Sequence, residues 1–419
     1  MAANPYTNAN SYIDDIGYDR CMTTSPSTDY EPQSSLSLKD PARDYASLHA
    51  ARVWVYADFS PTLYVLSRYE DVRDALSNSS VFSSAHGNRP RPMLAQGLQS
   101  DPPAHTTPRT LLQNAFVSSL TSAVRDTAAV KAADLLANLK TRAHWDLHDD
   151  YALPLSISVL GKLVGVPAEE MELFQYYSEA QALSTLTPGT NDRQDLLNED
   201  QADFSEYLLN KIIATRKGVH KTGIIPALIE GADSSQGFTD NSVLTLVLHL
   251  LAEGLEPSAT LVTNALWRTL PQRRLWQQLE QNPHLVQQLI DESLRFDPPT
   301  LAVFRSTTQS NNDYGTQIPS SARVMLHLGA ANRDVAVFEE PNRFNAQRAG
   351  TRHVSFGLGN HFCVGAQVAQ IIANTAIASV RQACPELGLR GQGERTQAFY
   401  QWGRRRLPVA TKATAGRPA

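Results

Sequence analysis

The sequence predicts a mainly α protein with small β sheets, folded as a single domain. Three observations lead to this prediction. Helical patterns dominate after residue 104, the β-rich runs are short, and no internal repeat or linker divides the chain. With 419 residues, 42% of them hydrophobic, the chain can bury a large core without disulfides or oligomerisation.

The N-terminal part begins with a polar segment. Residues 1–36 are rich in Ser, Thr, Asn, Asp and Tyr, so we expect an extended or disordered arm there and the folded domain over 37–412. Two β-rich runs within 54–66 predict a hairpin, and helical spacing follows it. The stretch 83–103 has few apolar anchors and is long enough to be a functional loop.

The rest of the chain is mostly helical. The spacing of apolar residues predicts helices at 110–140, 156–182, 198–216 and 284–296. Thr239 or Asp240 can cap a longer helix to about Leu270, roughly 45 Å at about 1.5 Å per residue. A helix so long and apolar must cross the core. Short strands follow to about residue 328, and a loop region leads to Cys363 and a last helix.

Charge and cysteine content exclude several classes of protein. The 37 Lys and Arg against 42 Asp and Glu give a formal charge of −5, which provides no basic field for nucleic acid or anionic lipid. Three cysteines are too few for a disulfide framework in a chain this long. We see no signal peptide and no membrane span. We therefore expect a cytoplasmic protein.

Cys363 stands among glycines in the segment HVSFGLGNHFCVGAQVAQ, just before a predicted helix. Glycines let the backbone approach a bulky group closely. A thiolate near a helix N-terminus is favoured by the helix dipole and by free N–H groups. Such a cysteine can be the axial ligand of a haem iron or a reactive redox thiol, and a buried inert cysteine is the third possibility.

The residues around Cys363 resemble the haem-binding signature of the cytochromes P450. Six positions within ten residues carry the match: Phe356, Gly357, Gly359, His361, Cys363 and Gly365. The resemblance covers about residues 38–410. It implies the P450 fold, a single triangular domain, with haem b (iron protoporphyrin IX) between the long central helix and this loop. Cys363 would then be the ligand of the iron, and Phe356, Gly357, His361 and Gly365 would help to bind the cofactor.

The resemblance also assigns roles outside this loop. Haem propionates need basic partners, and the matching positions are His105, Arg109, Arg305 and His353. Glu292 and Arg295, at i and i+3 on one helix, resemble the core Glu-x-x-Arg pair of the family. Together with Arg343 they would lock the loop behind the haem, a structural role.

The central helix departs from the family pattern beside the oxygen site. The family has an acid followed by an alcohol there, and this chain has Gly254, Leu255, Glu256, Pro257 and Ser258. Glu256 supplies the acid, but Pro257 has no hydroxyl and should open or kink the helix. In the family, protons must reach the iron-bound oxygen, and the hydroxyl helps to deliver them. Here they could come from Ser258 turned inward by the kink, from the substrate, or from a water held by Glu256. We expect Gly254, Glu256, Pro257 and Ser258 to form the catalytic segment.

Further polar residues occur in segments that face the substrate in the family. Glu253 either faces solvent, pairs with a neighbour, or faces the cavity, where it would attract a cationic group. In the loop, Arg89, Arg91, Gln96 and Gln99 are possible substrate contacts. We favour the interpretation that these four residues are solvated residues of the loop.

The resemblance implies a haem-thiolate monooxygenase that uses O2 and electrons from NAD(P)H through a separate ferredoxin or flavodoxin system. We expect hydroxylation, epoxidation or oxidative coupling of an intermediate in natural-product biosynthesis, such as antibiotic biosynthesis, by a monomer. The substrate would be a small molecule, free or bound to a carrier protein. Two alternatives stay open: a peroxide-driven or non-oxygenase P450, and a non-catalytic haem- or ligand-binding protein with this fold.

Overall fold

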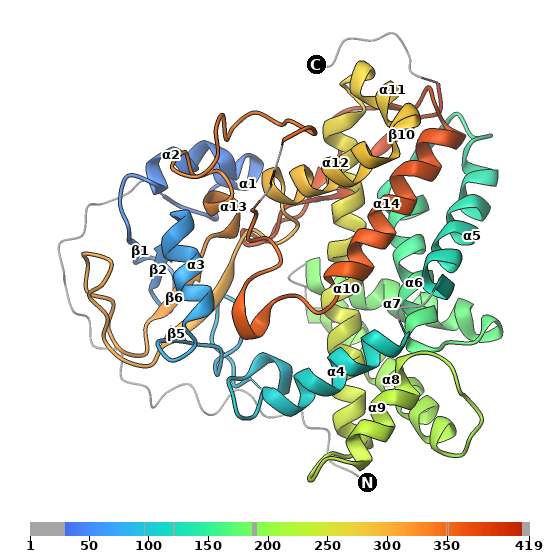
Figure 1. The fold of residues 1–419 in the computed structure, drawn as a ribbon, viewed down its shortest axis with the longest axis horizontal. Coiled ribbons are helices and arrows are strands. Elements are labelled where there is room, and N and C mark those ends of the chain that lie inside the picture. Colours follow the sequence, from blue (N-terminus) through green and yellow to red (C-terminus); the bar gives the residue numbers. More distant parts are fainter. Residues whose placement is uncertain are drawn as a thin grey trace.

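The computed structural model describes residues 30–95, 97–119, 122–186, 191–348, 350 and 352–412. Helices make up one side of the molecule, and a small β region lies on the other side (Figure 1). The expected mainly α fold with small sheets is therefore confirmed.

The predicted arm lies mostly outside the described residues, but its last part is folded. Tyr30 is buried, with its ring beside that of His327, which in turn contacts the ring of Tyr45. The helix α1 (Ser35–Lys39) begins before residue 37. The side chain of Ser34 caps this helix by accepting a hydrogen bond from the N–H of Ser37 at 3.1 Å. Within the described residues, folded structure thus begins before residue 37, and the sequence shows neither this cap nor the contact of Tyr30 with the distant His327.

The helices follow the chain in a regular order. The longer ones are α3 (Tyr69–Ser77), α4 (Thr106–Ser119), α5 (Ser122–Leu139), α6 (Leu153–Val164), α7 (Met171–Leu186), α8 (Asn191–Arg216), α9 (Ile224–Asp233), α10 (Asp240–Thr269), α11 (Arg273–Gln281), α12 (Pro283–Phe296) and α14 (Ala366–Ala383). The short ones are α1, α2 (Tyr45–Leu48) and α13 (Leu328–Ala331). A π-helical turn, His148–Ala152, leads directly into α6.

The described strands form one larger sheet, which makes up the β region, and two small sheets, one of them with its strand β10 among the helices in Figure 1. The larger sheet has the order β1-β2-β6-β5-β3, with only β2 and β6 parallel. Its strands are β1 (Trp54–Tyr56), β2 (Leu63–Leu66), β3 (Phe82–Ser83), β5 (Val303–Thr307) and β6 (Arg323–Leu326). β1 and β2 form the predicted hairpin. The small sheets contain β4 (His144–Asp146), β7 (Gly388–Leu389) and β10 (Pro408–Ala410), and β8 (Glu394–Arg395) and β9 (Arg404–Arg406).

α10 is the predicted central helix. Thr239 is its N-cap, in a reciprocal capping box with Ser242. It contacts α6, α8, α12 and α14, and Figure 1 shows it in yellow beside the red α14. The helix continues through Pro257 to Thr269, so the proline removes one backbone hydrogen bond without ending the helix.

Two predicted helices are each divided in the structure. The region 156–182 contains α6 and α7, because Gly165 ends α6 in the left-handed conformation (φ +98°) and Pro167 follows. A Cβ at Gly165 would come within 2.1 Å of the Thr222 carbonyl oxygen, so only glycine fits there. The region 110–140 contains α4 and α5, which pack on different partners, α4 on α9 and α5 on α14.

Candidate active site

Cys363 lies in a tight loop at the start of α14. Its N–H donates to the carbonyl of Phe356 at 2.8 Å, and the backbone N–H groups of Gly365 and Ala366 are directed at its sulfur. Burial raises the pKa of the Cys363 thiol, and these N–H groups and the guanidinium of Arg109 offset only part of this rise. The loop therefore surrounds the sulfur with groups that stabilise a thiolate, the form that binds a metal.

Two glycines give this loop its shape. Gly357 and Gly359 have φ angles of +69° and +65°, a conformation that residues with a side chain rarely adopt. A Cβ at Gly359 would also lie 3.1 Å from the carbonyl oxygen of Leu76 in α3. The glycine pattern recognised in the sequence is thus required by the backbone.

Arg305 is a buried cation in β5. It is 4% exposed, and the hydrogen bond described for its guanidinium goes to the carbonyl of Phe304, 2.8 Å away. Burial lowers its pKa to about 10, and Asp101 only partly offsets this. Within the part of the chain that the structure describes, no carboxylate is hydrogen-bonded to it. Such a group requires an anionic partner.

His105, His361 and Arg109 lie near Arg305. Like Arg305, they are donors or cations whose pKa is lowered by burial. The rings of His105 and His361 are 4.5 Å apart between centroids, and Nε2 of His361 is buried without a partner among the described residues. Burial, then Arg305 and His105, lower the pKa of His361 to about 3. Burial likewise lowers the pKa of Arg109. A largely buried group of donors and cations with too few acceptors, in which Arg109 and His361 are partly exposed, fits the two propionates of a haem.

His353 lies beside the Cys363 loop. Its ring is 5.8 Å from that of Phe356, and its Nδ1 accepts a bond from the N–H of Ser355 at 3.4 Å. Burial and the nearby Arg295 lower its pKa to about 4, so the ring is neutral at neutral pH. No described contact joins His353 to Arg305 or His105.

The predicted pair of Glu292 and Arg295 is a buried ion pair. Both side chains are fully buried, with Nε of Arg295 2.7 Å from Oε2 of Glu292. The third member is wrong in our prediction. The side chain of Arg343 is 69% exposed and pairs with Glu340, while Nε of Arg348 lies 3.2 Å from Glu292. The carbonyl of Arg343 accepts from Arg295, so its side chain points away from the pair.

The acid of the central helix is bound to a histidine. Glu256 is 4% exposed, and its two oxygens lie 3.1 and 3.2 Å from Nε2 of His148. Thr260, one turn later, donates to the same carboxylate at 3.1 Å. Sequence reasoning did not single out His148 or Thr260. Thr260 had a signal in its i+4 spacing from Glu256, but His148 had none.

The neighbours of Glu256 are closely packed. Ser258 is buried. A Cβ at Gly254 would lie 3.2 Å from a methyl group of Leu160, so this glycine lets α6 approach α10 closely. Pro257 and Glu256 line one small pocket together with Thr260.

Two loop residues that we expected to be solvated contact α10 instead. Arg89 forms an ion pair with Glu253, 2.7 Å apart, and lies over the ring of Tyr400. Gln99 lies 3.3 Å from Nδ1 of His249. Glu253 therefore has a partner and does not simply face solvent. Arg91 is exposed, as expected, and Gln96 lies outside the described residues.

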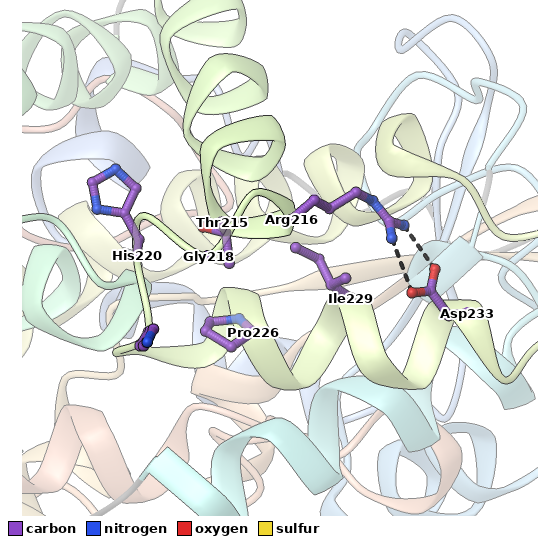
Figure 2. A pocket seen from close by; sticks show the side chains of 8 residues that line it. Thr215, Arg216, Gly218, His220, Pro226, Ile229 and Asp233 are labelled. Atoms are coloured by element: carbon purple, nitrogen blue, oxygen red, sulfur yellow. Dashed lines mark hydrogen bonds and ion pairs between the residues drawn. The ribbon is translucent and has the colours of Figure 1, made fainter.

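A separate surface cleft lies where α8 ends and α9 begins (Figure 2). Arg216 faces Asp233 there in a two-bond ion pair of 2.8 and 2.9 Å, with His220 and Pro226 also in its lining. The cleft contains none of the residues predicted for the haem.

Among the helices of the described ranges, none is long and apolar enough to cross a bilayer.

Comparisons with known proteins agree with this geometry. The family model for cytochrome P450 matches residues 185–384. The chain is 30% identical to Cytochrome P450 107B1 of Saccharopolyspora erythraea, covering 77% of this chain and 82% of that protein. It is 26% identical to the polyketide biosynthesis cytochrome P450 PksS of Bacillus subtilis, covering 70% and 71%.

A solved structure shows the same fold. The crystal structure of CYP109B1, described as a versatile cytochrome P450 enzyme from Bacillus subtilis, superimposes with a TM-score of 0.78 at 25% identity. The match covers 88% of this chain and 99% of that one. The chain therefore belongs to the cytochrome P450 family of haem monooxygenases.

Proposed function

We propose that the protein is a haem-thiolate monooxygenase in which Cys363 binds the iron of haem b. The observation that carries this proposal is the Cys363 loop, where two backbone N–H groups are directed at the sulfur and two glycines have positive φ angles. Phe356, packed at the ring of His353, and Gly365, at the helix start, complete the loop. When bound, the haem supplies the iron at which dioxygen is reduced and the substrate is oxidised.

Basic residues around this loop would hold the propionates. Arg305 and Arg109 bring positive charge into a partly dehydrated site, and His105, His353 and His361 add neutral N–H donors. The buried pair of Glu292 and Arg295, with Arg348, would keep the loop rigid. Rigid support of this kind keeps a ligand sulfur in place.

The substrate that we propose is an intermediate of natural-product biosynthesis, free or bound to a carrier protein. It would be hydroxylated, epoxidised or oxidatively coupled. The support is the likeness to PksS, whose name places that protein in polyketide biosynthesis. We further propose that electrons come from NAD(P)H through a separate ferredoxin or flavodoxin. We also propose a cytoplasmic monomer, with the catalytic domain over residues 37–412.

A peroxide-driven P450 is the second candidate function. Pro257 favours it, because the turn of α10 next to Glu256 has no hydroxyl where the family has a threonine. Vigorous product formation with hydrogen peroxide alone, and none with NADPH and redox proteins, would select this candidate.

The first experiment is a spectroscopic titration of the purified ferric protein. The reduced, carbon monoxide-bound protein should give the thiolate-type spectrum, and the C363S variant should lose it. Aromatic, polyketide, terpenoid and amino-acid compounds are then added while the Soret band is followed. A saturable shift to high spin identifies the substrate class. If no compound shifts the Soret band, the search moves to carrier-bound substrates. Absence of the thiolate-type spectrum overturns the proposed function.

A further inference from the structure

Three side chains form one hydrogen-bonded series behind the acidic turn of α10. Nδ1 of His148 lies 2.7 Å from Oδ1 of Asp149, and Nε2 of His148 lies 3.1 Å from Oε1 of Glu256. His148 and Glu256 are buried, whereas the side chain of Asp149 is 48% exposed. The series therefore connects solvent with a buried carboxylate of the central helix.

The geometry sets the charge of the histidine. Both ring nitrogens face carboxylate oxygens, which only accept hydrogen bonds, so both nitrogens must carry a proton. Burial lowers the pKa of His148, but the carboxylates of Glu256 and Asp149 raise it by more, to about 10. Burial raises the pKa of Asp149, and its bonds to His148 and Arg406 more than reverse this. His148 is thus an imidazolium at neutral pH.

Other charged groups surround the exposed end of the series. Arg406 in β9 lies 3.6 Å from Oδ2 of Asp149 and 3.7 Å from Glu394. Asp150, next in the π-helical turn, pairs instead with Arg142 at 3.7 Å. Of these groups, only Asp149 is bonded to the ring of His148 in the described structure.

At its other end the series reaches a very small, mainly apolar pocket, whose lining includes Pro299 and Trp402. Glu256, Pro257 and Thr260 line it, together with Thr396 and Gln401. The hydroxyl oxygen of Thr396 and Oε1 of Gln401 are buried and have no partner among the described residues. Buried polar atoms of this kind are usually bonded by ordered water. Within this mainly apolar lining, the few polar groups lie beside the turn of α10 that contains Pro257.

We propose that His148, oriented by Asp149, supplies the proton that Glu256 passes into this pocket during oxygen reduction. The inference rests on the proposed function and deepens it. The Nε2–H bond breaks as an O–H bond forms on Glu256, and the electron pair of the N–H bond stays on the ring, which becomes neutral. Glu256 then releases the proton into the pocket, and uptake of one proton from solvent restores the imidazolium. Because His148 acts through Glu256, it is a positioning residue.

The kinetic test uses the haem-loaded protein without substrate. NADPH reduces it through a ferredoxin and its reductase, and oxygen consumption is measured from pH 6 to 10. The wild-type rate should fall at alkaline pH as His148 loses its proton. The H148Q variant keeps a donor to Glu256 but has no releasable proton. We therefore expect its rate to be at least about tenfold lower than that of the wild type, without the fall at alkaline pH.

Two surface variants complete the kinetic test. D149N removes the carboxylate bonded to His148 and should move the alkaline fall to lower pH. E394Q removes a neighbouring carboxylate that contacts Arg406 but not His148, so its profile should equal that of the wild type. Asp149 is half exposed, so D149N tests the proposal even where H148Q fails to fold.

A second readout is independent of activity. Histidine-selective NMR of the reduced, carbon monoxide-bound protein identifies His148 by the resonance that H148Q lacks. At pH 7.5 both of its nitrogens should carry protons, and D149N should lower the pH of its titration. A neutral His148 at pH 7.5 overturns the proposal. So does a slower H148Q with an unchanged alkaline fall, which indicates a structural role only. Failure of the proposed function is distinct, because the wild type would then lack the thiolate-type spectrum.

Discussion

Nε of Arg348 lies 3.2 Å from the same oxygen of Glu292 that accepts a bond from Arg295. Arg348 also donates to the carbonyls of Glu339, Glu340 and Arg343, so one side chain fastens the 339–348 segment to α12. The fully buried carboxylate of Glu292 thereby has two cationic partners, an arrangement in which removal of either one is costly.

Replacement of Arg348 should therefore destabilise the protein, and replacement of Arg343 should not. R348A removes charge-assisted hydrogen bonds at a buried carboxylate and should lower the free energy of unfolding by about 2 kcal/mol. R343A removes an exposed side chain and should change it by less than about 0.5 kcal/mol. Urea unfolding followed by circular dichroism measures both. Equal effects of the two variants would contradict the assignment.

The local features of the site could be predicted from the sequence, and the distant ones could not. Gly357 and Gly359 are recognisable because their φ angles are a property of the loop itself. Arg343 and Arg348 lie in the same loop, and which one turns toward Glu292 depends on how that loop packs on α12. His148 lies 108 positions from Glu256, so no short-range pattern could join them. Arg89 and Glu253, 164 positions apart, were missed as a pair for the same reason.

Arg305 should hold the haem through its charge. In R305M the aliphatic stem remains and a buried cation is lost, so the transfer of haem to apomyoglobin should become about 10- to 100-fold faster, as expected for loss of a charge-assisted hydrogen bond. R91M, on the exposed part of the loop, is the matched control and should leave the rate unchanged. A transfer rate in R305M equal to that of the wild type would remove Arg305 from the propionate site.

Pro257 should cost the protein stability. The helix is continuous around it, so P257A can restore the backbone bond to the carbonyl of Glu253 and should raise the free energy of unfolding by about 1–3 kcal/mol. P283A is the control, because Pro283 stands at the first position of α12, where proline is tolerated. Thermal unfolding of the two variants measures the difference. Destabilisation by P257A would mean that the free carbonyl of Glu253 has another partner.

The charge of His148 should make the stability of the protein depend on pH. Its pKa is raised from 6.5 to about 10 in the folded chain, so the stability that its proton contributes is fully present below pH 6.5. This contribution is lost as the pH rises from 6.5 toward 10. The thermal midpoint of the wild type should accordingly exceed that of H148Q most at pH 6 and least at pH 10.

The comparison between variants isolates the histidine. Tyrosines and lysines that titrate above pH 9 are the same in both proteins, so their effects cancel in the difference of the midpoints. E256Q removes the carboxylate and should lower the pKa of His148, so that the same loss of stability occurs at a lower pH. A difference between wild type and H148Q that stays constant from pH 6 to 10 would show that the ring is neutral throughout, and that Glu256 is held by a neutral hydrogen bond.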